Sequence, residues 1–369
     1  MLPHTIISTV GTSLLSNLQN LAKDSVDEHR ELLQAYLAGE WGQLSRRLRQ
    51  LDSNNRLCDA EINSLHDLLE RRLIQTPPLN LHFCVSETDD GKRLGDLLQA
   101  YYEEQEIRTR VHIIEGLQDA RPSIFRMHGL RNLARKIGEI IRQVGDPSCV
   151  AINATGGYKA QIAIAVLIGQ TLGVAVYYKH ERFPEIISFP PMPISFNYDL
   201  LGRHAALLGK MERGKLFEMA EEDIDPSLRV LLEEAESDEG KRLWALAPIG
   251  QIYLEGFRQR YPLAKTLPPP ADKRTAPTLP AHHYPIGFKD FVAGVWRENG
   301  FITGCHSLPY DKQQSMRDRE FYVRHDGQIV GEYTDRNGFG ARFAVNTTAE
   351  TMVQKTAVII HLNEKYGHE

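Results

Sequence analysis

INATGGYKAQIAIA, residues 152–165, joins the end of a strand-like run to a glycine turn and the start of a helix. Cys149 to Ile152 is short, apolar and β-prone, Thr155-Gly156-Gly157 permits a tight turn, and Tyr158 to Leu172 has a helical apolar pattern. The free N–H groups and the positive dipole end of such a helix favour an anion, and Lys159 adds a full charge. Phosphate is the expected ligand, and a tight turn without a ligand is the alternative. The spacing matches neither the Walker A loop nor the Gly-x-Gly-x-x-Gly fingerprint.

The composition is that of an ordinary globular protein, and its 369 residues predict two or three domains. Hydrophobic residues make up 42%, charged residues 25%, and the net charge of −5 argues against a dedicated polybasic surface. Cys58, Cys84, Cys149 and Cys305 form no Cys-x-x-Cys pair, so we expect no zinc site, no disulfide framework and a reducing compartment. Because no long apolar run or signal-like N-terminus is present, we expect a cytoplasmic protein without a membrane partner.

Strands and helices alternate over roughly the first 200 residues. The first strand, HTIISTV (4–10), ends in Gly11-Thr12-Ser13-Leu14. Further strands are expected at 80–87, 108–117, 149–153 and 174–180, and helices at 28–51, 56–75, 90–105, 127–144 and 158–172. This order favours a right-handed, mostly parallel α/β sheet.

Three loops should converge at the carboxyl edge of that sheet: Gly11 to Leu14, Ser86 to Asp89, and Ala154 to Lys159. Backbone amides, small hydroxyls and one lysine suit a phosphate-containing ligand. Arg126 and His128 could add donors, although surface or capping roles are the simpler expectation for both.

GTSLL (11–15), NATGGYKAQIAIA (153–165) and YYKHERFPEIISFPPMPISF (177–196) together resemble the CARF domains of CRISPR-associated proteins, which are Rossmann-like sensors of cyclic oligoadenylates. The resemblance covers about residues 1–200. It implies an allosteric activator such as cyclic tetra-adenylate, no other cofactor, and a homodimer with one ligand across its two-fold axis. The implied ligand contacts, with Ser86 added from the second loop, are Gly11, Thr12, Ser13, Leu14, Ser86, Thr155, Gly156, Gly157, Tyr158 and Lys159.

Residues 201–265 form a charged segment that is expected to fold as a small helical module of winged-helix type. LWALAPIGQIYLEGF (243–257) is included in its helical pattern. The segment has 10 Lys and Arg against 12 Asp and Glu, whereas phosphate binding needs the opposite balance. We therefore expect a connector rather than a DNA reader.

A proline-rich linker is expected at 266–285, because residues 268–285 contain six prolines in 18 positions. Such a segment is expected to join neither helix nor sheet. His282 and His283 are adjacent there, but they lack the further ligands of a metal site. The linker separates the sensor from residues 286–369.

Residues 286–369 are predicted to fold as a helix, an antiparallel meander and a closing helix. The helix is expected at 289–298 and the strands at 319–324, 328–334 and 341–346, with turns at Asp326-Gly327 and Asn337-Gly338. Thr347 and Glu350 form the expected capping box of the closing helix. The size and element order of this α+β unit resemble RelE-type toxins.

The RelE resemblance implies a metal-independent endoribonuclease that cuts mRNA on the ribosome by attack of the 2′-hydroxyl. This chemistry needs cations on the phosphate together with a base and an acid. The candidate catalytic residues are Arg319, Arg324, His325, Arg342 and Lys365, with Tyr366 and His368 as further candidates. For each of them, a solvent-facing position without a catalytic role is the alternative.

Three other functions stay open. Arg319 and His325 have the spacing of the HEPN ribonuclease motif, although the surrounding sequence alternates like a hairpin. The chain could instead be a ligand-controlled transcription regulator that uses segment 201–265. Finally, Ser13 and Lys159 could support cleavage of the cyclic ligand itself, as in ring nucleases.

Overall fold

The computed structural model describes residues 2–24, 29–52, 55–180, 183, 185–235, 241–309, 316 and 318–367. The chain forms two compact units, Met1–Ser195 with Ala247–Gln259, and Phe196–Leu246 with Arg260–Glu369. It therefore passes from one unit to the other three times. These units do not coincide with the predicted sensor, connector, linker and effector, and that division stays a prediction.

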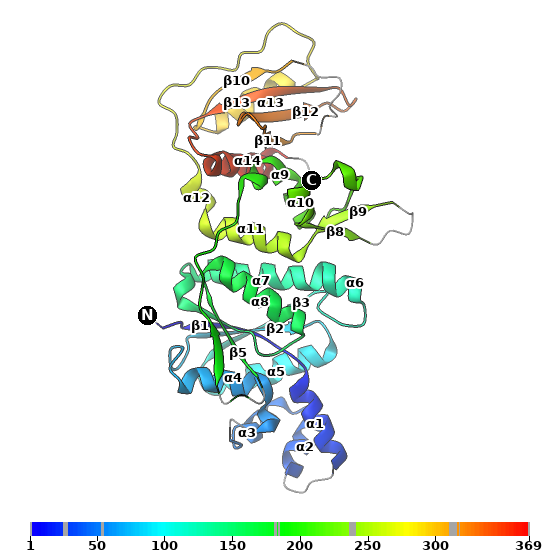
Figure 1. Ribbon diagram of the computed structural model, residues 1–369, viewed down its shortest axis with the longest axis vertical. Coiled ribbons are helices and arrows are strands. Elements are labelled where there is room, and N and C mark those ends of the chain that lie inside the picture. The colour runs from blue at the N-terminus through cyan, green and yellow to red at the C-terminus, as the bar shows by residue number, and fades with distance from the viewer. Residues whose placement is uncertain are drawn as a thin grey trace. The chain divides into compact units, whose positions relative to one another are not determined.

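The first unit contains a six-stranded sheet in the order β3-β2-β1-β4-β5-β6 (Figure 1). The strands are β1 (Thr5–Thr9), β2 (Asn80–Ser86), β3 (Arg108–Ile114), β4 (Val150–Asn153), β5 (Ala175–Lys179) and β6 (Ile186–Phe189). β1 to β5 run parallel and β6 runs antiparallel to β5. The predicted mostly parallel α/β sheet is confirmed. Its strand order reverses between β1 and β4, which is where ligands bind in doubly wound sheets.

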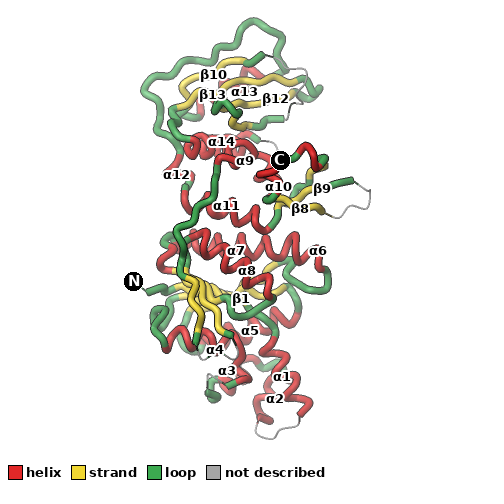
Figure 2. Tube along the Cα trace, viewed as in Figure 1, coloured by secondary structure: helices red, strands yellow, loops and turns green. Residues whose placement is uncertain are grey.

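Helices cover both faces of this sheet. α7 (Leu130–Val144) and α8 (Lys159–Leu172) lie on one face, and α4 (Asp59–Glu70) and α5 (Asp89–Glu103) lie on the other (Figure 2). The predicted helix 28–51 is divided into α2 (Arg30–Leu37) and α3 (Trp41–Leu48), because Gly39 turns the chain with a φ of +69°. The predicted helix 127–144 starts as a π-helical turn at Phe125–Gly129. The remaining helices of this unit are α1 (Ser13–Asp24), α6 (Pro122–Ile124) and α11 (Pro248–Arg260), whose last residue is assigned to the second unit.

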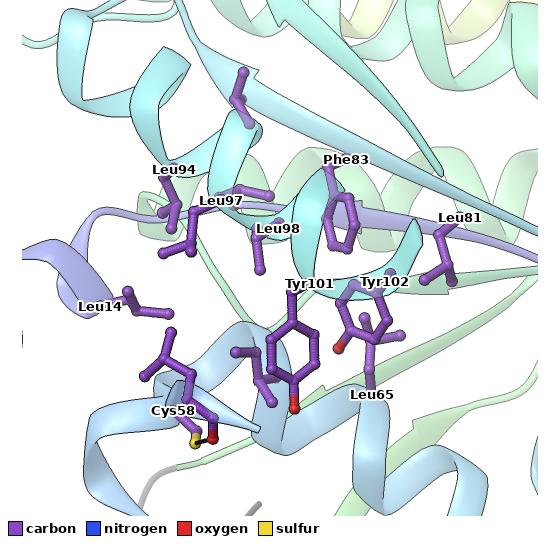
Figure 3. Packing of buried hydrophobic residues seen from close by; sticks show 14 of the residues in the cluster. Leu14, Cys58, Leu65, Leu81, Phe83, Leu94, Leu97, Leu98, Tyr101 and Tyr102 are labelled. Atoms are coloured by element: carbon purple, nitrogen blue, oxygen red, sulfur yellow. Dashed lines mark hydrogen bonds between the residues drawn. The ribbon is translucent and has the colours of Figure 1, made fainter. Parts of the chain in front are cut away.

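A hydrophobic core packed against β1 and β2 holds the loop that follows β1 in place. Tyr101 and Tyr102 of α5 belong to this core together with Phe83 of β2 (Figure 3). The Tyr102 ring lies 5.7 Å from the Phe83 ring and 4.9 Å from the Tyr101 ring. Leu14 is fully buried in the same cluster. Burial of such a side chain stabilises the fold by about 1.5–3 kcal/mol, so Leu14 anchors α1 through its side chain.

The second unit contains a four-stranded antiparallel sheet in the order β10-β13-β12-β11. Its strands are β10 (Ile302–Ser307), β11 (Phe321–Val323), β12 (Ile329–Thr334) and β13 (Gly340–Thr347), and it is accompanied by α13 (Phe288–Glu298) and α14 (Met352–Tyr366). The sequence prediction therefore missed β10, which pairs with β13 and forms one edge of the sheet. The two turns are correct, since Gly327 and Gly338 have φ values of +82° and +77°. The helix cap is wrong, because Thr347 belongs to β13 and Thr351 caps α14 by accepting the Gln354 N–H.

Segment 201–265 is less helical than predicted. It includes most of α9 (Asp199–Glu212), short helical turns at Glu221–Asp223 and Pro226–Arg229 (α10), the whole of α11, and all but the last residue of α12 (Leu263–Thr266). A three-stranded sheet β7-β9-β8 also lies here, built from Phe217–Glu218, Leu243–Leu246 and Leu232–Ala235. The helix predicted over 243–257 begins only at Pro248, because Leu243–Leu246 pairs as a strand with β8.

The proline-rich segment 268–285, hereafter the strap, is extended as predicted but is not free of the sheet. The N–H groups of Ala271, Thr275 and Thr278 donate to carbonyls of Gly300, Thr303 and Cys305, at 3.0, 2.8 and 2.8 Å. The Arg274 guanidinium lies 4.6 Å from the Trp296 ring and donates to the Ile302 carbonyl. Proline removes donors only at its own positions, so the intervening residues can pair with an edge strand. The expectation that this segment joins no sheet was wrong.

Candidate functional site

The loops after β1 and β4 meet where the strand order reverses. Ser8 and Asn153 are paired neighbours at the ends of these strands. Just beyond them, Thr9 Oγ1 donates to the Gly156 carbonyl at 2.6 Å. A Cβ on Gly11 would lie only 2.8 Å from the Gly157 nitrogen. The two predicted ligand loops therefore form one continuous surface.

Glycine is required in the second loop for two separate reasons. A Cβ on Gly156 would lie within 2.2 Å of Glu61 Oε1 and 2.9 Å of the Thr9 carbonyl oxygen. Gly157 has a φ of +102°, a conformation that L side chains rarely adopt. Gly156 thus lets the loop pack closely against Glu61 of α4 and Thr9 of β1, and Gly157 lets the backbone turn.

The predicted contacts divide into exposed and structural groups. Thr12, Ser13, Tyr158 and Lys159 are exposed, whereas Leu14 and Gly156 are buried. Thr155 is used within the loop: its Oγ1 donates to Asn153 Oδ1 at 2.7 Å and accepts the Lys179 N–H at 3.1 Å. Ser86 is 5% exposed, and its Oγ is bonded to Thr88 Oγ1. The Tyr158 N–H is bonded to Gln161 Oε1 and the Gln161 N–H to the Tyr158 carbonyl, so a ligand would meet the side chains of Thr12, Ser13, Tyr158 and Lys159 and the other amides at the start of α8.

Three polar side chains of α4 support this surface, and none of them was predicted. Glu61 Oε1 accepts the Gly11 N–H at 2.7 Å, Ser64 Oγ accepts the Asn153 Nδ2–H at 2.8 Å, and Asp67 Oδ2 lies 3.4 Å from Lys179 Nζ. Their spacing of three residues places them on one face of the helix. Because Glu61 takes the Gly11 amide, this amide is directed into the protein rather than toward a ligand.

Aromatic rings lie next to the cationic end of the site. The Phe125 ring contacts the Tyr158 ring edge-on at 5.2 Å. Burial and a hydrogen bond to Asp119 raise the pKa of Tyr158. Arg126 is exposed on the same π-helical turn as Phe125, whereas His128 is bonded to Arg131, and burial lowers its pKa. The chain thus offers an aromatic surface beside Lys159, as nucleobase binding requires.

The predicted catalytic residues of the second unit do not all share one surface. Arg342 is 7% exposed, and its Nε donates to Glu332 Oε1 at 2.7 Å. Its neighbour Phe343 contacts α13, so Arg342 points to the opposite face of the sheet. The Arg319 guanidinium lies on the α13 side, 5.7 Å from the Phe291 ring and 5.5 Å from the Tyr333 ring. Arg319 and Arg342 therefore cannot act on one phosphate.

The other candidates lie at the ends of elements. Arg324 and His325 are exposed in the β11–β12 turn, where Arg324 Nε lies 3.8 Å from Asp326 Oδ2. Lys365 pairs with Glu298 at 3.0 Å, and Tyr366 donates to the same carboxylate at 2.8 Å. These contacts raise the pKa of Lys365 and lower that of Glu298. His368 lies outside the described residues.

Comparisons with known proteins give a match to a protein-family model and matches to solved structures. No curated protein matches the chain. Among solved structures, Can2 from Sulfobacillus thermosulfidooxidans in complex with cyclic tetra-adenylate is 10% identical, with a TM-score of 0.26, over 70% of this chain and 62% of that one. A TM-score this low does not establish a shared fold. Residues 56–192, which contain the β4–α8 turn and the supporting α4, match the protein-family model described as CRISPR-associated protein (Cas_APE2256).

Proposed function

We propose that this protein is a ribonuclease of type III CRISPR antiviral defence, activated by a cyclic oligoadenylate, that cleaves mRNA on the ribosome in the cytoplasm. The observation that carries the proposal is the contact between the Gly11 and Gly157 loops at the point where the strand order reverses. The family match over residues 56–192 supports the CRISPR association.

The activator is an anionic, purine-rich ring such as cyclic tetra-adenylate. Its phosphates bind the amides at the start of α8 and the Lys159 ammonium, because both carry positive charge at one exposed surface. Adenine packs against the Tyr158 ring, which Phe125 holds from the side. A symmetric ring is best shared by two copies of the surface, so the active form is a homodimer.

The second unit is the nuclease. Its antiparallel sheet with a C-terminal helix resembles the α+β architecture of RelE-type enzymes. The partners that this proposal implies are mRNA and the ribosome. Exposed Arg324 and His325 are better placed to reach RNA than Arg342, which is buried in an ion pair. The ribosome supplies most of the binding surface, since the chain carries a net charge of −5.

Cleavage assays with two RNA targets test the proposal. The full-length chain is incubated with cyclic tetra-adenylate and either programmed ribosomes or the same mRNA alone. We expect cleavage on ribosomes that depends on the activator, and Lys159→Ala should require more activator without a lower maximal rate. Lys215→Ala, which removes an exposed lysine of the second unit, is the matched control. Cleavage of free RNA alone would favour a HEPN-like enzyme, and no cleavage of either target would favour a transcription regulator.

A ring-nuclease activity is a second candidate for the same site. Ser13 and Lys159 are both exposed, each two residues beyond the Gly11 and Gly157 positions where the loops meet, and a hydroxyl and a cation are the groups that cleavage of a phosphodiester would use. Chromatography of cyclic tetra-adenylate after incubation with the protein would detect linear products. A ring that stays intact through many turnovers of mRNA cleavage would leave the sensor as a binding site only.

A further inference from the structure

A depression of about 350 Å³ lies where the strap ends and α13 begins. It is lined by His282, His283, Tyr284, Pro285, Gly287, Lys289 and Asp290. The sequence assigned the two histidines to a free linker. In the structure, Thr278 before them is bonded to Cys305 and Ile286 after them is bonded to Tyr333 and Asp335, so the histidines do not lie on a free linker.

The floor of this depression is anchored to β12 and its following turn. Tyr333 Oη donates to the Ile286 carbonyl at 2.8 Å, and the Ile286 N–H donates to Asp335 Oδ2 at 3.3 Å. Gly287 allows the sharp entry into α13 with a φ of +83°, and a Cβ there would lie 2.7 Å from Tyr333 Oη. Such anchoring on a sheet provides the rigidity that a catalytic or binding site needs.

Groups suited to RNA converge around this floor. His282 and His283 are exposed, and Lys289 Nζ lies 5.5 Å from the centre of the Tyr284 ring. The Tyr284 ring stacks on Phe288 at 5.0 Å, and among the described residues its buried Oη has no hydrogen-bond partner. The depression thus combines two imidazoles, an ammonium and an aromatic ring with one carboxylate, that of Asp290.

A second aromatic ring extends this surface. Phe339, which is 39% exposed, lies 5.5 Å from the His283 ring. Unstacked bases bind to exposed aromatic faces, and phosphates bind to nearby ammonium groups. Imidazole is also the side chain that most readily exchanges a proton near neutral pH. These properties together fit a single-stranded RNA segment with its phosphodiester near Lys289.

We propose that this depression is the site where the second unit binds single-stranded RNA and cleaves it. The proposal rests on the ribonuclease function above and replaces the meander arginines as the centre of the chemistry. One imidazole takes the proton of the 2′-hydroxyl, whose oxygen attacks phosphorus. The P–O5′ bond breaks, and the other imidazole, initially protonated, gives its proton to the leaving 5′-oxygen. The products are a 2′,3′-cyclic phosphate and a 5′-hydroxyl, so no metal, water or redox partner enters the balance. Lys289 stabilises the charge on the phosphorane.

Four variants of the full-length chain test the site: His282→Asn, His283→Asn, Lys289→Met and, as a control, Lys273→Met. Lys273 is an exposed lysine of the strap outside the depression. Single-turnover cleavage on programmed ribosomes with saturating cyclic tetra-adenylate should fall about 10²–10⁴-fold in each histidine variant and about 10²–10³-fold in Lys289→Met. The control should cut at the parental rate. The parental cleavage rate should have a bell-shaped pH dependence, and each histidine variant should lose one of the two limbs of that profile.

Binding of a 2′-O-methyl RNA oligonucleotide, which cannot be cleaved, gives a readout that does not depend on activity. Fluorescence anisotropy should show weaker binding by Lys289→Met than by the parent and by Lys273→Met. If the parent cuts RNA and both histidine variants cut equally well, this site is overturned while the proposed function stands. If the parent cuts neither ribosome-bound nor free RNA, the proposed function fails and the cleavage site fails with it. If the parent cuts RNA but the oligonucleotide binds all four variants equally, the depression is not the RNA site.

Discussion

Replacement of Arg342 decides whether this residue serves the fold or the chemistry. Its guanidinium donates to Glu332 at 2.7 Å, and the two side chains are only 8% and 4% exposed. Glu332 also accepts a hydrogen bond from Tyr322 Oη at 3.2 Å. Burial and the neighbouring Glu332 carboxylate raise the pKa of Tyr322 to about 12, so the phenol stays a donor. Arg342→Met removes the cation and leaves this carboxylate buried without it.

The expected loss follows from desolvation. When one partner of a buried ion pair is removed, the remaining charge costs about 3–5 kcal/mol, whereas replacing both partners with apolar groups is often close to neutral. Arg342→Met and Glu332→Met should therefore each lower the free energy of unfolding by about 3–5 kcal/mol. The double variant should recover most of this loss, so the pair should show a large coupling energy in a double-mutant cycle.

Urea unfolding of the three variants and the parent measures these energies, and RNA cleavage is assayed below the unfolding transition. If Arg342 is structural, the double variant cleaves RNA at nearly the parental rate. The reasoning is refuted if Arg342→Met lowers stability by less than about 1 kcal/mol, well below the cost expected for a broken buried pair, and the folded variant is inactive. Arg342 would then be a catalytic residue, as the RelE resemblance implied.

Other outcomes are expected in the first unit. Lys159→Ala should weaken binding of cyclic tetra-adenylate about 10- to 100-fold in a calorimetric titration, because a charge-assisted phosphate contact is lost. Gly156→Ala should cost about 1–3 kcal/mol in urea unfolding, since its Cβ would meet Glu61 and Thr9, whereas Gly42→Ala in α3 should be tolerated. Burial and His112 lower the pKa of His82 from 6.5 to about 4. The free energy of unfolding should therefore be at its full value above pH 6.5 and fall as the pH drops toward 4, because the unfolded chain then binds more protons. This loss of stability, at most about 3 kcal/mol, should shrink in His82→Gln. Sedimentation should show a dimer, and a monomer that still binds cyclic tetra-adenylate would contradict the shared site.

The alternating strands and helices of the first unit could be predicted because each element has its own periodicity. Apolar runs such as HTIISTV and helices with apolar residues at three- and four-residue spacing need no knowledge of distant contacts. β6 and β10 were missed as strands because each pairs at or near a sheet edge, where register depends on a partner strand. The break between α2 and α3 was missed although Gly39 signals it.

The support of the ligand site was harder to predict. Glu61, Ser64 and Asp67 interrupt an apolar helix at regular spacing, and a polar stripe on a helix usually indicates a solvated face. Only the fold shows that this stripe meets Gly11, Asn153 and Lys179. The strap was misjudged for a similar reason: six prolines indicate extended chain, but they do not show whether an edge strand lies beside it.

The register of the β12–β13 hairpin determines which residue Arg342 faces. The Asn337-Gly338 turn was predicted correctly, but a two-residue loop centred on it would place Glu332 opposite Phe343. In the structure Asp335 N–H donates to the Phe339 carbonyl, and this longer loop places Glu332 directly opposite Arg342. Opposite charges facing each other across a hairpin usually pair. An arginine whose charge is already matched by a carboxylate is a poor choice for stabilising a phosphorane, because the carboxylate offsets its positive charge. Lys289 and the two histidines are exposed and line an open depression, where Asp290 is the one carboxylate among the lining residues, whereas Arg342 is held in a buried pair. Cross-strand charge pairing should therefore be checked before strand arginines are assigned to catalysis in domains of this kind.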